Sequence, residues 1–322
     1  MISVNSYNVI KNLLIETTTR CNLGCPGCYM RDRAKENLEF TIELFSEIVD
    51  ATQPQTVSFF GGEPLLWPYL REGILICRQR NIKISIASNL TLLAKESAHF
   101  LYNNEVMVFG KLNIGDITDT KQLDIQSKLI GSSREKVNKM ISGILLLKNI
   151  GFAAPGFNLN NFIRKDNIEF VGSFLEFCTE NNIEPFMEIS CNENDLSEKE
   201  IDSIVNQVQK YHKGPLMPPH FISRCRHFDS TLYFRPNGDI QACSGNKTIL
   251  ANFLTDQDAI TNALNNSIIK TRKNIVEHIN GECKQCDLLD QCKGGCRAYA
   301  EQISVNESYL KCWRNRQVNS FQ

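Results

Sequence analysis

The chain has 322 residues, a formal net charge of −1 at pH 7 and a sequence pI of about 6.5. This balanced charge argues against nucleic acid and anionic membranes as partners, because both require an extended basic surface. No apolar run reaches the roughly 20 residues that span a bilayer, and the start of the chain, Met1-Ile2-Ser3-Val4-Asn5, lacks a signal-peptide pattern. We therefore expect a cytoplasmic protein, in which disulfides are rare. The chain has 13 cysteines, and ten of them fall in two spacing patterns, which indicates metal ligation.

Apolar, strand-like runs alternate with amphipathic helical stretches from residue 13 to about residue 190, which is typical of repeated βα units and predicts an α/β fold. The expected strands lie at 13–18, 56–60, 82–87, 106–112, 157–163 and 184–190. The expected helices lie at 41–53, 66–80, 92–103, 134–149, 168–181 and 197–212.

Three cysteines follow the first strand, in the pattern Cys21-x3-Cys25-x2-Cys28. Thiols this close in sequence can converge on one metal centre only if the backbone wraps around it, and the intervening glycines and proline favour such a reversal. A structural zinc site normally has four protein ligands, whereas three cysteines on a 4Fe–4S cluster leave one iron open. A zinc loop with a distant fourth ligand is the alternative.

The pattern resembles the radical S-adenosylmethionine (SAM) enzymes, whose cysteine motif is followed by an aromatic residue, here Tyr29. The family's GGEP element matches Gly61-Gly62-Glu63-Pro64 after the second strand. The resemblance implies a partial (β/α)6 TIM-like barrel. It also implies a 4Fe–4S cluster whose open iron binds SAM and cleaves it to a 5′-deoxyadenosyl radical that abstracts a substrate hydrogen. We expect the two glycines to let the backbone approach a ligand and Glu63 to accept a hydrogen bond from the methionine ammonium.

In a parallel barrel the site lies at the carboxyl ends of the strands, and these ends supply further candidates for cofactor contact. Ser88 and Asn89 follow the third strand, although they could instead cap the helix at 92–103. Lys111 and Asn113 end the fourth strand, and a lysine at a barrel mouth is unusual unless it is paired or solvated. Glu188, on the sixth strand, could face either side of the sheet.

The segment at 114–133 is long for a barrel loop, and it is expected to be either a lid or a solvated connector. Cys77 and Cys178 lie among apolar helix residues and are expected to be core. Cys191 directly follows the sixth strand and could face the site. If this thiol is catalytic, it would donate a hydrogen atom to a substrate radical.

A proline-rich linker near residue 215 separates the barrel, expected at 1–213, from a cysteine-rich region at 214–322. This region begins with a β-hairpin signal around Pro236-Asn237-Gly238-Asp239. Its cysteines resemble the seven-cysteine SPASM extension, with a pair of zinc ribbons as the alternative. The seven matching cysteines are Cys225, Cys243, Cys283, Cys286, Cys292, Cys296 and Cys312.

The SPASM resemblance implies two auxiliary 4Fe–4S clusters, and therefore three clusters in an oxygen-sensitive protein. The implied ligands of the distal cluster are Cys283, Cys286, Cys292 and Cys312. Those of the nearer cluster are Cys225, Cys243 and Cys296, which leaves it one ligand short. Cys191, His220 or His227 could complete it, or its iron could be open.

The resemblance implies an oxidoreductase or maturase that most often modifies a ribosomally made peptide by crosslinking, thioether formation or dehydrogenation. A flavodoxin- or ferredoxin-type reductant would supply electrons, and a separate leader-binding protein would be needed because few residues precede the first strand. Ser244 stands where the maturases of sulfatases often have an aspartate that acts as a base. This difference argues against a sulfatase maturase. The alternative is a small-molecule epimerase or dehydrogenase acting on a sugar, alcohol or cofactor precursor. An iron–sulfur electron carrier is disfavoured, because it would not need the GGEP element.

Overall fold

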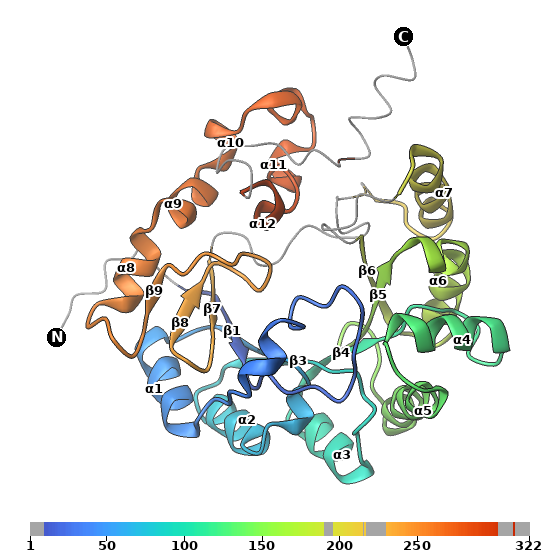
Figure 1. Ribbon diagram of the computed structural model, residues 1–322, viewed down its shortest axis with the longest axis horizontal. Coiled ribbons are helices and arrows are strands. Elements are labelled where there is room, and N and C mark those ends of the chain that lie inside the picture. Colours follow the sequence, from blue (N-terminus) through green and yellow to red (C-terminus); the bar gives the residue numbers. More distant parts are fainter. Residues whose placement is uncertain (1–9, 190–195, 215, 217–229, 302–311, 313–322) are drawn as a thin grey trace.

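A computed structural model describes residues 10–189, 196–214, 216, 230–301 and 312. Six parallel strands form a curved sheet, and helices cover its outer face (Figure 1). The strands are β1 Asn12–Glu16, β2 Thr56–Phe60, β3 Lys83–Ala87, β4 Met107–Lys111, β5 Phe157–Ile163 and β6 Glu184–Ile189. The covering helices are α1 Ile42–Thr52, α2 Leu70–Gln79, α3 Lys95–Asn103, α4 Thr120–Leu129, α5 Arg134–Ile150, α6 Val171–Glu180 and α7 Glu198–Gln209.

The expected partial (β/α)6 barrel is confirmed, and its strands and helices begin and end within four residues of the expected positions. Alternation along each strand decides which side chains are buried against the helices. On β2, for example, Phe59 packs against Phe45 of α1 and against Trp67, with ring centroids 5.6 and 5.7 Å apart. Cys77 and Cys178 are both fully buried in this layer, as expected.

The hairpin signal is also confirmed. β7 (Thr231–Phe234) and β8 (Asp239–Gln241) pair antiparallel, and β9 (Ala251–Asn252) follows. The hairpin does not form a separate sheet, because β7 pairs in parallel with β1, so that one sheet runs in the order β6-β5-β4-β3-β2-β1-β7-β8-β9. The division at 213 remains a prediction, but the sheet of the barrel continues across it.

Short helices follow the hairpin: α8 lies next to β9, and α9–α12 continue from it toward the upper centre of the view (Figure 1). They are α8 Ala259–Asn265, α9 Ser267–Lys273, α10 Ile275–His278, α11 Leu289–Cys292 and α12 Arg297–Ala300. In the described part of the chain, no helix has the length and apolar character needed to cross a bilayer.

Candidate active site

The loop after β1 carries the first three cysteines. Desolvation, together with the nearby charges of Glu63, Cys25 and Cys28, raises the pKa of the Cys21 thiol to about 11. The backbone turns back between the other two, where the Cys28 N–H donates to the Cys25 carbonyl at 3.3 Å. The described residues hold no ready-made metal site of three or more His, Cys, Asp or Glu side chains. The loop nevertheless places the three thiols within electrostatic range of one another.

The two glycines of the GGEP element fix the start of this loop. The Gly62 N–H donates to the Thr18 carbonyl at 2.7 Å, and the Glu63 N–H donates to the Arg20 carbonyl at 2.8 Å. A Cβ on Gly62 would lie 2.0 Å from the Arg20 carbonyl oxygen, and a Cβ on Gly61, which has φ +131°, would lie 2.5 Å from the Thr18 carbonyl oxygen. Both glycines therefore lie close to the backbone that leads into Cys21, and their expected approach to a ligand stays a prediction.

Gly62→Ala is therefore expected to push the backbone of residues 18–20 away from β2. Because the colliding atoms are backbone, we expect a loss of stability of about 1–3 kcal/mol and poor iron incorporation. Gly156→Ala is the matched control, since its Cβ would have its nearest neighbour at 3.4 Å, an ordinary contact. Iron analysis and thermal unfolding of both variants test this, and a Gly62→Ala protein that matches Gly156→Ala in both would contradict it.

Glu63 lies fully inside this corner, where it begins the short 3₁₀ helix Pro64–Leu66. Its carboxylate accepts from Ser88 Oγ at 2.7 Å, the Asn89 N–H at 2.8 Å and the Leu65 N–H at 3.1 Å. Burial raises the pKa of Glu63, and the three hydrogen bonds oppose that rise. Two carboxylate oxygens offer about four acceptor positions, so the carboxylate has room for one further donor.

Asn89 links Glu63 to the cysteine loop. Its Nδ2 donates to Asn22 Oδ1 at 2.9 Å and lies 4.0 Å from the Cys21 sulfur. Asn22 in turn donates to Thr91 Oγ1 at 2.7 Å. The alternative role for Ser88 and Asn89, capping the next helix, is wrong, because α3 begins at Lys95 after Ala94 and has no side-chain cap. Asn22 and Thr91 were not among the residues expected from the sequence, although Asn22 stands between the candidate ligands Cys21 and Cys25.

A second polar group lies at the ends of β4–β6. Lys111 Nζ donates to Asn160 Oδ1 at 2.9 Å and lies 5.2 Å from the ring centre of Phe162. Asn160 Nδ2 donates to Glu188 Oε2 at 2.8 Å. Desolvation lowers the pKa of Lys111 to about 8, opposed by the charges of Glu188, Cys25 and Cys28. Glu188 and Lys111 therefore lie on one face of the sheet, within electrostatic range of the cysteine loop.

Asn113 hydrogen-bonds to other residues than Lys111 does. Its side-chain oxygen accepts the Phe162 N–H at 2.9 Å, and its carbonyl accepts from Asn167 Nδ2 at 3.0 Å. It is buried. These contacts join the ends of β4 and β5, and its expected contact with cofactor stays a prediction.

The segment at 114–133 is not a plain solvated connector, because α4 occupies Thr120–Leu129 within it, and its role as a lid stays a prediction. Asp119 caps this helix by accepting the Gln122 N–H at 3.0 Å. The end of the segment meets the cysteine loop, and a Cβ on Gly131 would lie 2.1 Å from the Gly24 carbonyl oxygen. The capping aspartate and the apolar spacing of Leu123 and Ile130 are the signals that predict such a helix.

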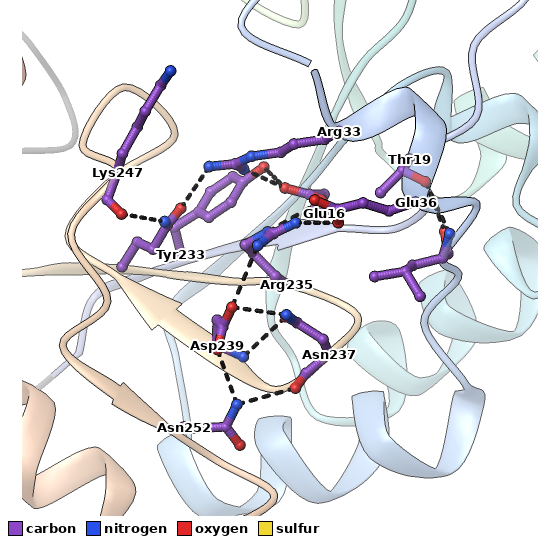
Figure 2. A network of polar contacts seen from close by, with 12 residues as sticks. Glu16, Thr19, Arg33, Glu36, Tyr233, Arg235, Asn237, Asp239, Lys247 and Asn252 are labelled. Atoms are coloured by element: carbon purple, nitrogen blue, oxygen red, sulfur yellow. Dashed lines mark hydrogen bonds and ion pairs between the residues drawn. The ribbon is translucent and has the colours of Figure 1, made fainter. Parts of the chain in front are cut away.

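A buried ionic network joins the cysteine loop to the β7–β8 hairpin, as Figure 2 shows around Glu16. Glu16 Oε2 accepts from Arg33 Nη1 at 2.6 Å and from the Tyr233 hydroxyl at 2.5 Å. Arg235 Nε lies 3.6 Å from Glu16 Oε1. Arg33, which begins the 3₁₀ helix Arg33–Glu36, also donates to Gln241 of β8 at 3.0 Å.

Tyr29, the aromatic residue after the third cysteine, joins the same network. Burial of its hydroxyl raises its pKa, as do the charges of Glu16 and Cys28, while a hydrogen bond with Tyr233 lowers it. Its hydroxyl is thus directed toward the hairpin, although 37% of the residue is exposed. Glu16, Arg33 and Tyr233 were not among the residues expected from the sequence, because Tyr233 lies 217 residues after Glu16 in the chain.

The described C-terminal cysteines fall into two groups, one of which contains Cys292 and the other of which lies beside buried arginines. Desolvation raises the pKa of Cys292 to about 12, and the charges of Cys312, Cys283 and Cys286 contribute to the rise, so these four thiols lie near one another. Cys243 lies instead beside the buried side chain of Arg272. Cys296 interacts with Arg297. The expected ligands Cys191, Cys225, His220 and His227 lie outside the described residues.

These donor sets fit the groups that the sequence implies. Cys21, Cys25 and Cys28 interact electrostatically at one end of the barrel, as do Cys283, Cys286, Cys292 and Cys312 in the C-terminal region, and thiolates are the ligands of 4Fe–4S clusters. The spare acceptor position of Glu63 suits an ammonium group. Both features lie at the carboxyl ends of the parallel strands, where barrel sites form.

Comparison with known proteins supports this interpretation of the barrel. A family model described as the radical SAM superfamily matches residues 15–178, just over half of the 322 residues. The tungsten-containing aldehyde ferredoxin oxidoreductase cofactor-modifying protein of Pyrococcus furiosus is 26% identical over 166 residues, which are 49% of this chain and 45% of that protein. The chain spans about half the length of the curated relatives it matches.

Two solved structures share the fold over nearly the entire chain. SuiB of Streptococcus suis, bound to the precursor peptide SuiA, has a TM-score of 0.70 at 17% identity and covers 95% of this chain and 76% of its own. The protein anSMEcpe with bound AdoMet has a TM-score of 0.73 at 16% identity, with coverages of 97% and 96%. The cysteine-rich C-terminal region is therefore included in the common fold.

Proposed function

The chain belongs to the radical SAM superfamily, and from this premise we propose that it is an enzyme that modifies a ribosomally made peptide. The observation that carries the proposal is the meeting of the Cys21–Cys28 loop with the Glu63–Asn89 pair at the ends of β1–β3. These two features provide, side by side, thiols for a cluster and an acceptor for the SAM ammonium.

Cys21, Cys25 and Cys28 would hold the cluster, and Glu63 would bind the methionine ammonium of SAM. When bound and reduced by an external electron donor, the cluster would supply the electron that cleaves SAM to methionine and a carbon radical able to take a hydrogen atom from substrate. Asn89 and Asn22 hold the loop against β3 through their 2.9 Å hydrogen bond. Lys111, Asn160 and Glu188 provide charged and amide groups on the same face of the sheet.

We further propose two auxiliary clusters in the C-terminal region. The electrostatic coupling of Cys292 with Cys283, Cys286 and Cys312 supports a four-thiolate site. Cys243 and Cys296, each next to a buried arginine, support a second site in which Cys225 is the third expected thiolate ligand. Auxiliary clusters suit reactions that remove an electron from a substrate radical, such as crosslinking, thioether formation or dehydrogenation.

The peptide substrate is favoured by the likeness to SuiB, whose solved structure contains a precursor peptide. A second candidate, modification of a small molecule or cofactor precursor, is favoured by the Pyrococcus furiosus relative, which is named for modifying a cofactor. The two differ in the molecule that is changed. A peptide crosslink or dehydrogenation leaves a peptide lighter by two hydrogen atoms. A small-molecule dehydrogenase removes two hydrogen atoms from the small molecule instead, and an epimerase incorporates deuterium from deuterated water without net oxidation.

The experiment is to incubate the reconstituted enzyme, SAM and a reductant with peptides encoded beside its gene, and to analyse the products by mass spectrometry. Loss of two hydrogen atoms from a peptide would support the proposal. Turnover of a sugar or cofactor precursor, with every peptide unchanged, would favour the second candidate.

Glu63→Gln is expected to weaken SAM binding by about 1.5–3 kcal/mol, the range for a hydrogen bond to a charged group. The iron content should remain that of the wild type, because no cysteine is changed. Isothermal titration of SAM measures the affinity. Asp119→Asn is the matched control, since Asp119 also caps a helix with its carboxylate but lies on α4. Equal affinities in the two variants would mean that Glu63 does not bind SAM.

A further inference from the structure

Arg272 is the most deeply buried cation near the C-terminal cysteines. Arg272 lies on α9, and only 1% of its surface is exposed. Its Nε and Nη2 donate to the two carboxylate oxygens of Glu301, both at 2.7 Å. Such two-point pairing fixes the plane and direction of a guanidinium group, so Arg272 has one defined orientation.

That orientation directs the remaining donors toward Cys243. Nη2 lies 3.8 Å from the Cys243 sulfur, within the distance for a hydrogen bond to sulfur, and Nη1 donates to the Ala242 carbonyl at 3.4 Å. Asn246 ties the same loop to Glu301 with a 2.7 Å hydrogen bond. Burial opposes the charge of Arg272, but the charges of Cys243 and Glu301 outweigh it and raise its pKa.

A second buried cation lies in the same neighbourhood. Arg297 is 2% exposed, and it interacts with Glu301 and with the thiols of Cys283 and Cys296. Glu301 interacts with both arginines. A buried cation is costly without a compensating anion, and thiolates at Cys243 and Cys296 would add negative charge to that of Glu301.

We propose that Arg272 is a positioning residue for the auxiliary cluster held by Cys243, fixing this sulfur through an N–H···S hydrogen bond and favouring the more reduced cluster through its charge. The inference rests on the proposed auxiliary cluster. It follows from electrostatics, because one-electron reduction adds a negative charge and a fixed cation in a poorly solvated site stabilises that charge. Hydrogen bonds to the sulfurs are among the features that set the potentials of iron–sulfur clusters.

The test is a redox titration, followed by electron paramagnetic resonance, of the full-length chain carrying Cys21→Ala, Cys25→Ala and Cys28→Ala, so that only auxiliary clusters contribute. Arg272→Gln is expected to reduce the equilibrium constant for one-electron reduction of one cluster about tenfold, which corresponds to about 59 mV. Arg272→Lys, which keeps the charge but not the two-point pairing, is expected to recover part of this shift.

Two further variants separate the effect of the charge from a structural effect. Arg272→Gln leaves the buried Glu301 carboxylate without its guanidinium partner. Arg272→Gln/Glu301→Gln removes both charges, and its cluster potential should shift in the same direction as that of Arg272→Gln. Arg80→Gln breaks a comparable two-point pair, with Asp50 at 2.7 and 2.9 Å, on the barrel surface, and should leave the potential unchanged.

The outcomes separate the inference from the proposed cluster. Unchanged potentials in the Arg272 variants, with iron content retained, would overturn the inference alone. If Cys243→Ala changes neither the iron content nor any redox signal, both the cluster at Cys243 and the role of Arg272 are wrong.

Discussion

Replacing Cys21, Cys25 and Cys28 together with alanine is expected to lower the iron content from about 12 to about eight per chain, because three tetranuclear clusters become two. Production of 5′-deoxyadenosine from SAM should cease. The proposed auxiliary clusters should remain, because none of their expected cysteine ligands is changed. Iron analysis of anaerobically reconstituted protein and chromatography of the nucleoside product measure both effects.

Cys178→Ala provides the matched control for this loss of iron. Cys178 is also a cysteine, but it is fully buried in the helix layer of the barrel, and its loss should leave iron content and SAM cleavage unchanged. If the triple variant retains all of its iron, the first cysteine loop does not hold a cluster.

The second large effect is expected at the ionic network around Glu16. Arg33→Met leaves the fully buried Glu16 carboxylate without its 2.6 Å partner. Breaking a buried pair on one side typically costs about 3–5 kcal/mol, and we expect the lower part of that range, because Arg235 lies 3.6 Å from the other oxygen. Chemical denaturation, with the midpoint and slope compared to those of the wild type, measures the change.

Two controls separate the buried charge from the loss of arginine as such. Arg78→Met breaks an ion pair of similar length, 2.7 Å, whose side chains are 40% and 74% exposed, and should cost less than about 1 kcal/mol. Glu16→Gln/Arg33→Met removes both charges and should recover much of the stability. A single Arg33→Met variant as stable as Arg78→Met would show that the network does not hold the loop to the hairpin.

The sequence could predict the parts of the site that depend on short-range spacing. The Cys21–Cys28 loop, the GGEP element and the hairpin are each contained within about a dozen residues, and the βα alternation gives the order of the strands. Parallel strands place their carboxyl ends at one edge, so the neighbourhood of Cys21, Glu63 and Asn89 follows from the fold class.

Contacts between distant segments could not be predicted in this way. Glu16 looks like an ordinary strand-end carboxylate until β7 brings Tyr233 beside it, 217 residues later in the chain. Arg272 likewise looks like one of several basic residues at the end of α9, and only packing shows that it is buried against Cys243. The close approach of the two glycines to the backbone of residues 18–20 could not be predicted either, because a sequence shows the need for space and not what fills it.

The most direct test of the proposed activity is SAM cleavage by the reconstituted wild-type protein with a chemical reductant and no substrate. We expect 5′-deoxyadenosine and methionine in equal amounts, from protein whose metal is iron in tetranuclear clusters. Protein purified without oxygen that contains zinc at its cysteine sites and forms no 5′-deoxyadenosine would contradict this activity.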